Sequence, residues 1–250
     1  MPKISTLILL FLFVSCKTEL KKTISTFRNG KPAVQIIFND KTDTTSGQIL
    51  QYYTDGKIYK KATIYKKRYV DRKVTYYSSG QISQIDSLSQ PCDLNIDQCN
   101  GTVIRYHENG NISQRYSVNN HELNGMTQQF TRNGKIAKEY ELIHDTIKNG
   151  IYREFYDNGR ISFQSTYKND TITGFCYYFN EQGDTLKYYN HFNGALSFPY
   201  KKWLDNRQIL YGDYTDRSEK SVTWIWRDKS GKEIKRKVAG SKKYGFVVPD

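Results

Sequence analysis

The sequence, 250 residues long, lacks the residue clusters on which most enzymes and metalloproteins depend. Its four histidines are scattered, and none stands at metal-ligand spacing from a cysteine or a carboxylate. It has neither a glycine-rich phosphate loop nor a Gly-x-Ser-x-Gly nucleophile elbow. From these absences we predict a protein that is not an enzyme and that uses neither a metal nor a cofactor.

Aliphatic residues are also scarce. The hydrophobic fraction is 37%, and 21 of the residues counted in it are tyrosines. A tyrosine buries an apolar ring while its hydroxyl stays in contact with water. This composition argues against a deep, compact core and favours a thin, extended sheet.

Acidic residues are outnumbered by basic ones, 25 against 38, which gives a formal charge of +13. The excess is concentrated in Lys57–Lys73 and Arg227–Lys243. A lysine-rich solvated face would keep an exposed sheet soluble and its edges apart. The alternative is attraction to anionic lipid headgroups or to other polyanions. Nothing resembles a nucleic-acid-binding motif, so we expect no nucleic-acid partner.

Long apolar runs are missing except for one at the N-terminus. Lys3 precedes the apolar segment Ile4–Val14, which is shorter than the ~20 residues of a membrane-spanning helix but suits a secretory signal. The segment is followed by Ser-Cys, ending at Cys16, and this resembles the lipobox of bacterial lipoproteins. Phe13 stands where that motif usually has an aliphatic residue.

The lipobox resemblance implies that residues 1–15 are a lipoprotein signal peptide and that Cys16 is the lipid attachment site, with palmitate among its acyl groups. Residues 16–25 are polar and charged and are expected to form a tether. We therefore expect a lipid-anchored protein of the bacterial cell envelope. It would be held in the outer membrane and face either the periplasm or the cell surface.

What the sequence does contain is an internal repeat of about 24 residues. Most units have a turn glycine, an aromatic residue four positions before it and an isoleucine two positions after it. The turn glycines are Gly30, Gly56, Gly80, Gly110, Gly134, Gly159, Gly183 and Gly231, and Arg207 stands where one more is expected. The recurrent aromatic and aliphatic residues are Tyr52, Tyr106, Phe130, Phe155, Phe179, Ile58, Ile82, Ile112, Ile136 and Ile161.

Each unit is expected to be a β-hairpin, because its arms are rich in Tyr, Phe, Ile and Thr and a turn signal lies between them. A two-residue type I′ loop would require Asn, Asp or Gly before every turn glycine, yet Ser79, Gln182 and Ser230 occupy that position. A type I turn closed by a left-handed glycine in a G1 bulge requires glycine only once. We therefore predict three-residue loops, with Phe155 opposite Ile161 on one face.

Nine such units over residues 26–237 predict an all-β protein of eighteen strands. Open sheets rarely exceed about ten strands without curling. The predicted fold is a tandem β-hairpin array that forms either an elongated twisted antiparallel sheet or a hairpin solenoid, with each hairpin stabilised by its neighbours. Residues 238–250 are expected to be a last edge strand or a tail that covers the edge.

One insertion, at residues 86–100, interrupts the period. It contains Cys92 and Cys99, which are expected to form a loop-closing disulfide in an oxidising envelope. The alternation D-x-N-x-D that starts at Asp93 is that of a calcium loop. The glycine that should follow is missing, so a solvated acidic loop is the better interpretation. Cys176 is interpreted as a small apolar residue of a strand.

The repeated pattern G-x-x-x-x-[YF]-x-x-x-G-x-I, as in Gly101–Ile112 and Gly150–Ile161, resembles MORN-type repeats. It is more closely similar to the bacterial MORN-like variant of the YwqK family of antitoxins, over roughly Thr26–Lys237. The resemblance implies a hairpin array that acts as a binding or scaffolding surface. An antitoxin should meet its toxin in the cytoplasm, whereas Cys16 implies export, so an immunity-like role against an envelope-acting toxin would reconcile the two.

Together these features favour a non-catalytic protein-interaction or scaffold module on a lipid tether, with a Tyr-rich face for a protein or membrane partner. The alternative is recognition of a glycan or cell-wall polymer, because tandem aromatic hairpins are similar to choline-binding wall repeats and stacked rings bind sugars or quaternary amines. Those repeats carry tryptophan in nearly every unit, whereas the three tryptophans here are all at or after Trp203. Aromatic rings in open grooves between hairpins would favour the glycan, and a flat face rich in Tyr hydroxyls would favour protein contact.

Overall fold

The structure is a computed structural model that describes residues 20–145, 149–192, 195–204, 208–214, 221–240 and 248–249. All regular structure in this part of the chain is β-strand, so the described residues include no helix that could cross a membrane. The strands are β1 (Leu20–Thr26), β2 (Pro32–Phe38), β3 (Gly47–Tyr52), β4 (Ile58–Tyr65), β5 (Arg68–Tyr76), β6 (Ile82–Leu88), β7 (Cys92–Asp93), β8 (Gly101–Tyr106), β9 (Ile112–Asn119), β10 (Glu122–Leu123), β11 (Gly125–Phe130), β12 (Ile136–Leu142), β13 (Asn149–Phe155), β14 (Ile161–Lys168), β15 (Thr171–Phe179), β16 (Thr185–Phe192), β17 (Ala195–Trp203), β18 (Ile209–Tyr214), β19 (Ser221–Arg227) and β20 (Glu233–Gly240).

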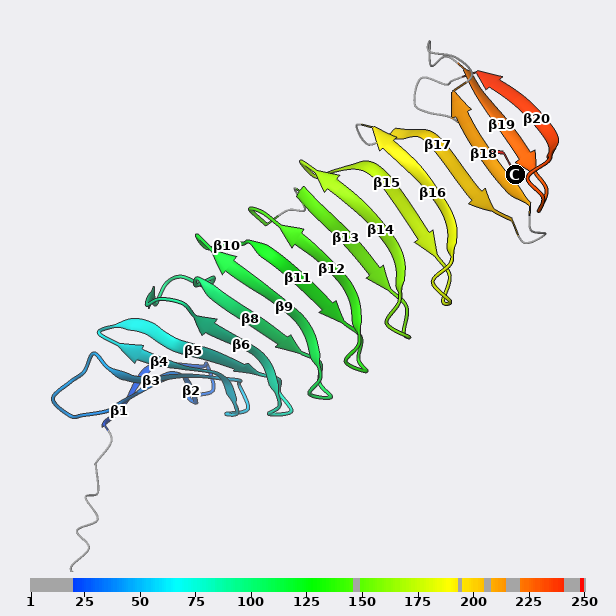
Figure 1. The fold of residues 1–250 in the computed structure, drawn as a ribbon. Helices are drawn as coiled ribbons and strands as arrows, with labels where there is room; N and C mark the ends of the chain where they lie inside the picture. The colour runs from blue at the N-terminus through cyan, green and yellow to red at the C-terminus, as the bar shows by residue number, and fades with distance from the viewer. Residues whose placement is uncertain are drawn as a thin grey trace, which may run out of the picture.

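The strands form one antiparallel sheet in which the long strands follow each other in chain order (Figure 1). The short β7 and β10 are additions that pair with β5 and β9. β1 and β20 lie at opposite ends of an elongated, open sheet, and the direction of the strands rotates gradually between them (Figure 1). The chain is therefore an open twisted sheet and not a closed solenoid.

The turns along one long edge of the sheet have the predicted three-residue geometry. In the hairpin β13–β14, the Gly159 amide donates to the Tyr156 carbonyl at 2.9 Å, and the Tyr156 amide donates to the Arg160 carbonyl at 2.8 Å. Gly159 has φ +83°, the left-handed value that a G1 bulge requires. Phe155 pairs with Ile161, as predicted.

The same pair of turn hydrogen bonds recurs in seven further hairpins, so the nine-unit count agrees with the structure. The hairpin β17–β18 keeps its outer bond, from the Leu204 amide to the Gln208 carbonyl at 2.8 Å, and Trp203 pairs with Ile209. The hairpin therefore survives without a turn glycine. Arg207 itself lies outside the described residues.

The turns along the opposite edge are of a different kind, which the sequence did not reveal. Lys168 pairs with Thr171, so only Asn169 and Asp170 remain in the loop, and both have positive φ. This is the two-residue type I′ turn. The corresponding turn between β4 and β5 places Lys66 and Lys67 in the same left-handed conformation, which is unfavourable for residues with long side chains. The array thus uses type I turns with G1 bulges on one edge. On the other edge, type I′ turns connect β4 to β5, β9 to β10 and β14 to β15, beside longer connections at residues 39–46 and 89–100.

Three boundaries differ from the sequence-based expectation. β1 begins at Leu20, so residues 20–25, expected to belong to the tether, form an edge strand that pairs with β2. The backbone of β2 needs a partner on that side, whereas the side chains of β1 are mostly exposed and carry no strand signal. β6 extends to Leu88, which limits the insertion to residues 89–100, and β20 extends to Gly240.

Side chains alternate between two faces along each strand. We call the face that bears the Phe155–Ile161 pair and its equivalents the repeat face, and the other the core face. Three clusters of buried residues lie on the core face: around Ile64, around Tyr116 and around Trp224. The first of them is covered by the disulfide loop, and Val248 packs against the last. Burial is therefore concentrated at separate places along one side of the sheet.

Neighbouring hairpins are joined at the turn edge by a recurrent side-chain hydrogen bond. The Tyr53 hydroxyl donates to the Tyr76 carbonyl at 2.7 Å. In the next units the Tyr77 and Tyr156 hydroxyls each donate at 2.6 Å, to the carbonyls of the equivalent aromatic residues Tyr106 and Phe179. His107 replaces the tyrosine in one unit, and its Nε2 lies 3.1 Å from the Phe130 carbonyl. Each of these bonds ties one turn to the strand of the following hairpin.

We expect Y77F and Y156F each to lower the free energy of unfolding by about 1 kcal/mol. Each variant removes the hydroxyl that donates a hydrogen bond to a backbone carbonyl of the following hairpin. The measurement is urea unfolding of the mature C16S form followed by tyrosine fluorescence. Y65F serves as the matched control, since Tyr65 is 54% exposed and is not one of the tyrosines that bond to the following hairpin. Equal losses of stability in all three variants would show that these hydrogen bonds between hairpins do not stabilise the sheet.

Candidate binding surfaces

The structure brings the recurrent aromatic and isoleucine residues together in one row on the repeat face. Tyr52 pairs with Ile58 and Tyr106 with Ile112, and Phe130 pairs with Ile136 in the same way. In the unit of Phe179, Thr185 takes the place of the isoleucine. The turn glycines lie beside this row at the sheet edge and have positive φ. They shape the turns.

The row on the repeat face is partly open to solvent. Ile58 is 37% exposed and Ile82 is 39% exposed, although both belong to regular strands. Between the turns of β11–β12 and β13–β14, a hollow of about 330 Å³ is lined by Ile136 and Phe155 together with turn residues. The apolar row therefore has both protruding and recessed parts.

A second set of aromatic rings extends the repeat face toward the C-terminal strands. Phe175 and Tyr177 on β15 contact Tyr188 on β16, with ring centroids 5.8 and 5.9 Å apart. Tyr188 in turn contacts Trp203 on β17 at 6.2 Å, and the Lys201 ammonium lies over the Trp203 ring at 4.4 Å. This part of the face is aromatic and not aliphatic.

The core face has a stripe of rings across its central strands. Tyr140 and Tyr152 stack at 5.8 Å, Phe163 and Tyr178 lie 4.7 Å apart, and Tyr178 contacts Tyr189 at 5.8 Å. Small residues pair with several of these tyrosines across the strands. They are Thr127, Ser165 and Cys176, each almost fully buried.

The tyrosine hydroxyls of this stripe are engaged by neighbours. Tyr178 and Tyr189 hydroxyls lie 2.8 Å apart, and burial raises the pKa of Tyr189. The Tyr152 hydroxyl donates to Glu154 at 2.6 Å, and burial followed by that carboxylate raises the pKa of Tyr152 to about 12. Burial also raises the pKa of the Cys176 thiol to about 11, so this cysteine is a packed small residue and not a reactive thiolate.

A hollow of about 400 Å³ opens on this side between the hairpins β13–β14 and β15–β16. It is lined by aromatic, polar and aliphatic residues: Tyr156, Phe163, Tyr178, Phe179, Glu154, Ser162 and Leu186. It is an aromatic groove between hairpins, which is the feature that would favour a glycan.

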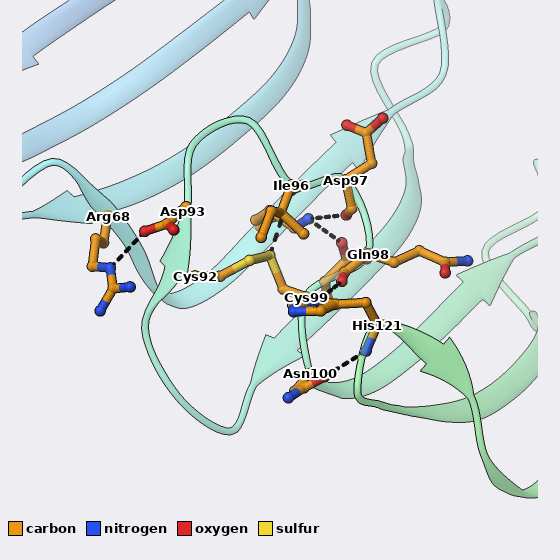
Figure 2. Close-up of a disulfide and its surroundings, with 11 residues drawn as sticks. Arg68, Cys92, Asp93, Ile96, Asp97, Gln98, Cys99, Asn100 and His121 are labelled. Carbon is orange, nitrogen blue, oxygen red and sulfur yellow. Dashed lines mark hydrogen bonds and ion pairs between the residues drawn. A yellow bond between two sulfur atoms is a disulfide. The ribbon is translucent and has the colours of Figure 1, made fainter. Parts of the chain in front are cut away.

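The insertion forms a loop that is closed by a Cys92–Cys99 disulfide with an S–S distance of 2.03 Å (Figure 2). The loop packs over the core face at the N-terminal end, where both cysteines are buried against Ala62 and Tyr69. Polar contacts hold its outer side: Arg68 Nε lies 2.7 Å from Asp93 Oδ1, and His121 Nδ1 lies 2.7 Å from the Gln98 carbonyl (Figure 2). The bond to Arg68 lowers the pKa of Asp93.

A buried charge pair lies beneath this loop. The Lys73 side chain is 1% exposed, and its ammonium is 3.1 Å from the Asp86 carboxylate on the neighbouring strand. The same ammonium donates to the Asp97 carbonyl of the loop at 2.7 Å and lies over the Tyr69 ring at 5.5 Å. The sequence predicted that Lys73 belongs to a solvated basic run, and this prediction is wrong because the side chain is buried. Lys73 connects the sheet to the disulfide loop.

Among the described residues, no group of three or more His, Cys, Asp or Glu side chains could hold a metal ion. Cys16, the lipid attachment site expected from the sequence, lies outside the described residues. What the described residues offer is two extended surfaces and one clamped loop.

Two segments of the chain, residues 100–120 and 148–169, match the model of the MORN repeat variant. They coincide with the hairpins β8–β9 and β13–β14. The chain is a MORN-like repeat protein. No curated protein matches it. The unmatched MORN-like units share the turn hydrogen bonds of the matched ones, which shows that they are the same structural element with more divergent sequences.

We expect K73A to lower the free energy of unfolding by roughly 3–5 kcal/mol, because it leaves the Asp86 carboxylate buried without its partner. The double variant K73M/D86L should be clearly more stable than K73A, since it removes both charges and keeps the volume. Urea unfolding of the C16S form measures both, and K61A, at an exposed lysine of β4, is the control. A double variant no more stable than K73A would show that the charge pair is not the cause.

Proposed function

We propose that this MORN-like protein is a non-catalytic interaction scaffold of the bacterial cell envelope, lipid-anchored through Cys16, that recruits a protein partner on its repeat face. The observation that carries this proposal is the row of apolar side chains across successive hairpins, partly exposed and covered by no other described element. Exposed apolar surface of this extent is typical of interaction sites.

The shape of the row suits a protein surface. It runs across the strands for most of the length of the sheet, so a partner can gain area from many units at once. Aromatic and aliphatic anchors that fill complementary recesses dominate protein interfaces, and the hollow beside Phe155 and Ile136 is such a recess. In several units, hydrogen bonds from a turn to the strand of the next hairpin hold the edge of the row in place. Less conformational entropy is therefore lost when a partner binds.

The proposed anchor fits the position of the sheet. Only three residues separate Cys16 from the first residue of β1. A lipid on Cys16 would therefore hold the β1 end at the bilayer, while the C-terminal strands lie at the other end of the elongated sheet (Figure 1). Such an arrangement presents the repeat face to partners away from the membrane.

Glycan recognition is the second candidate. The observation that favours it is the aromatic hollow between β13–β14 and β15–β16, where four aromatic residues lie together with Glu154 and Ser162. Rings with a few polar groups are what a sugar-binding subsite contains.

The similarity to YwqK antitoxins suggests one identity for the protein partner. If Cys16 is acylated, the partner would be met outside the cytoplasm, and the protein would act as an immunity-like factor against an envelope-acting toxin. The repeat face would then be the surface that contacts the toxin.

The repeat-face proposal predicts that I58E/I82E abolishes co-purification of the partner protein captured by the C16S form from crosslinked envelope extracts. The reason is that two carboxylates in the middle of an apolar contact cannot be desolvated without a partner. I234E is the matched control, because Ile234 is 49% exposed on the edge strand β20 and lies outside the row.

Circular dichroism should show that the double variant keeps its fold, since both positions are solvent-accessible in the free protein. If I58E/I82E still captured the same protein, the repeat face would not be the contact surface. If only wall fragments were recovered with the wild type, the protein-partner proposal would fail.

For the anchor, we expect C16S to abolish metabolic incorporation of an alkyne-labelled palmitate and to shift the protein from the detergent phase to the aqueous phase. A single acyl group anchors weakly and two or more anchor stably, so loss of the attachment site removes membrane retention altogether. C176S, which changes a buried cysteine, should keep both the label and the partition. A labelled C16S protein would refute the assignment.

A further inference from the structure

The core face of the last strands carries cations without counter-charges. Lys187 and Lys202 are direct cross-strand partners on β16 and β17. Lys235 and Lys237 pair with Trp226 and Trp224 on the same face. We call these four residues the lysine patch.

Among the described residues, the strands at this end of the sheet place no carboxylate on the core face. The only described acidic residues of the strands β15–β20 are Asp213 and Glu233. Asp213 pairs with Thr223, and Glu233 pairs with Arg227, which places both on the repeat face. None of the four lysines of the patch forms an ion pair within the described part of the chain. The patch is therefore a local excess of positive charge.

Two of the four lysines lie over aromatic rings. The Lys187 ammonium lies 4.1 Å from the centroid of Tyr178 and 5.9 Å from that of Tyr189. The Lys235 ammonium lies 4.6 Å from the Trp226 ring. Burial, and then the charge of Lys202, lowers the pKa of Lys187. A partly desolvated ammonium group such as that of Lys187, which lacks a carboxylate partner, is ready to accept an external anion.

The geometry of the patch selects an extended anion. Adjacent strands are about 4.8 Å apart, so the cations are spread across the strands in the direction of the long axis of the sheet. A polymer that carries repeated negative charges and crosses β16 and β17 meets Lys187 and Lys202 in succession, and Lys235 on β20 lies beyond the buried cluster around Trp224. A single small anion would use only the Lys187–Lys202 pair.

The polar groups of the patch discriminate between classes of polymer. An extended peptide that lies on a sheet face must satisfy its own backbone amides, and burying them without partners is costly. The backbone groups of β16–β19 are engaged in the sheet, and the described core-face side chains of β15–β20 include no Asn or Gln. A saccharide has no backbone amides to satisfy, and the Tyr178 and Tyr189 hydroxyls can bond its hydroxyl groups.

We propose that the lysine patch binds an acidic polysaccharide, with Lys187 and Lys202 contacting successive carboxylates or sulfates of the polymer. The inference extends the glycan candidate to a defined class of glycan, and it does not depend on protein contact at the repeat face. The patch lies at the end of the sheet far from β1 (Figure 1), where a lipid-held protein would reach polymers outside the membrane.

The test uses the full mature C16S protein and polygalacturonate oligomers in isothermal titration calorimetry. The wild type should bind, and K187M/K202M should bind at least about tenfold more weakly, because two charge contacts are lost while the aliphatic stems keep their packing. K21M/K22M on β1 removes the same net charge from exposed lysines and should bind like the wild type. Fully methyl-esterified galacturonan, which has the same backbone without charge, should not bind.

Other outcomes overturn the proposal. If K187M/K202M and K21M/K22M bound polygalacturonate with the same affinity, binding would depend on net charge and not on the lysine patch. Binding of poly-glutamate or single-stranded DNA as tight as that of polygalacturonate would make the patch a general polyanion surface. Near-UV circular dichroism verifies that the variants keep the packing of the wild type. A Lys187→Arg/Lys202→Arg protein keeps both positive charges and should bind polygalacturonate like the wild type. I58E/I82E should bind the polysaccharide normally, so failure of the repeat-face proposal is distinguishable from failure of this one.

Discussion

Pairing between neighbouring hairpins is the interaction on which the rest of this structure depends. In the described residues one sheet supplies nearly all the regular structure, so a hairpin cannot rely on a second layer and must bond to the hairpins on either side. The backbone ladders provide most of this pairing. The Tyr53, Tyr77 and Tyr156 hydroxyls add a bond at the turn edge that reaches into the following unit. The replacement of this tyrosine by His107, with the same acceptor position, shows that the contact matters more than the residue type.

This dependence explains which parts of the fold could be predicted from the sequence. A hairpin leaves a strong local signal, because a left-handed glycine and a facing pair such as Phe155 and Ile161 are required by its geometry. The unit count, the turn type and the all-β class followed from that signal. The type I′ turns did not, since Lys66 and Lys67 adopt left-handed conformations only under the constraint of the paired strands around them. A sequence pattern within one hairpin therefore predicts the turn that this hairpin needs, but not a conformation imposed by the strands paired around it.

The candidate surfaces were harder to predict for the same reason. The repeat face could be inferred because its residues recur at fixed positions in each unit. Lys73 looked like part of a solvated basic run, and only the fold shows it buried against Asp86 beneath the disulfide loop. Lys187 and Lys202 lie outside both basic runs of the sequence, and their proximity arises from strand pairing. Residues that differ between units acquire their role from neighbours that are distant in the chain.

A comparison of equivalent positions separates scaffold from function on the core face. Near the turns, the N-terminal units place polar groups that compensate each other: Arg105 contacts Gln84 and Gln114 at 3.0 and 3.3 Å, and Lys138 pairs with Glu154 at 2.8 Å. The equivalent row in the C-terminal units contains the lysines of the patch, which have no such partners in the described chain. Lys60 occupies the same row on β4, and its ammonium also lies over a ring, that of Tyr69 at 5.7 Å, without an ion pair among the described residues. A single lysine of this kind is therefore compatible with the scaffold alone. The C-terminal units differ in placing two such lysines, Lys187 and Lys202, directly opposite each other. Two adjacent like charges cost stability, so a ligand explains this pair better than the stability of the array does.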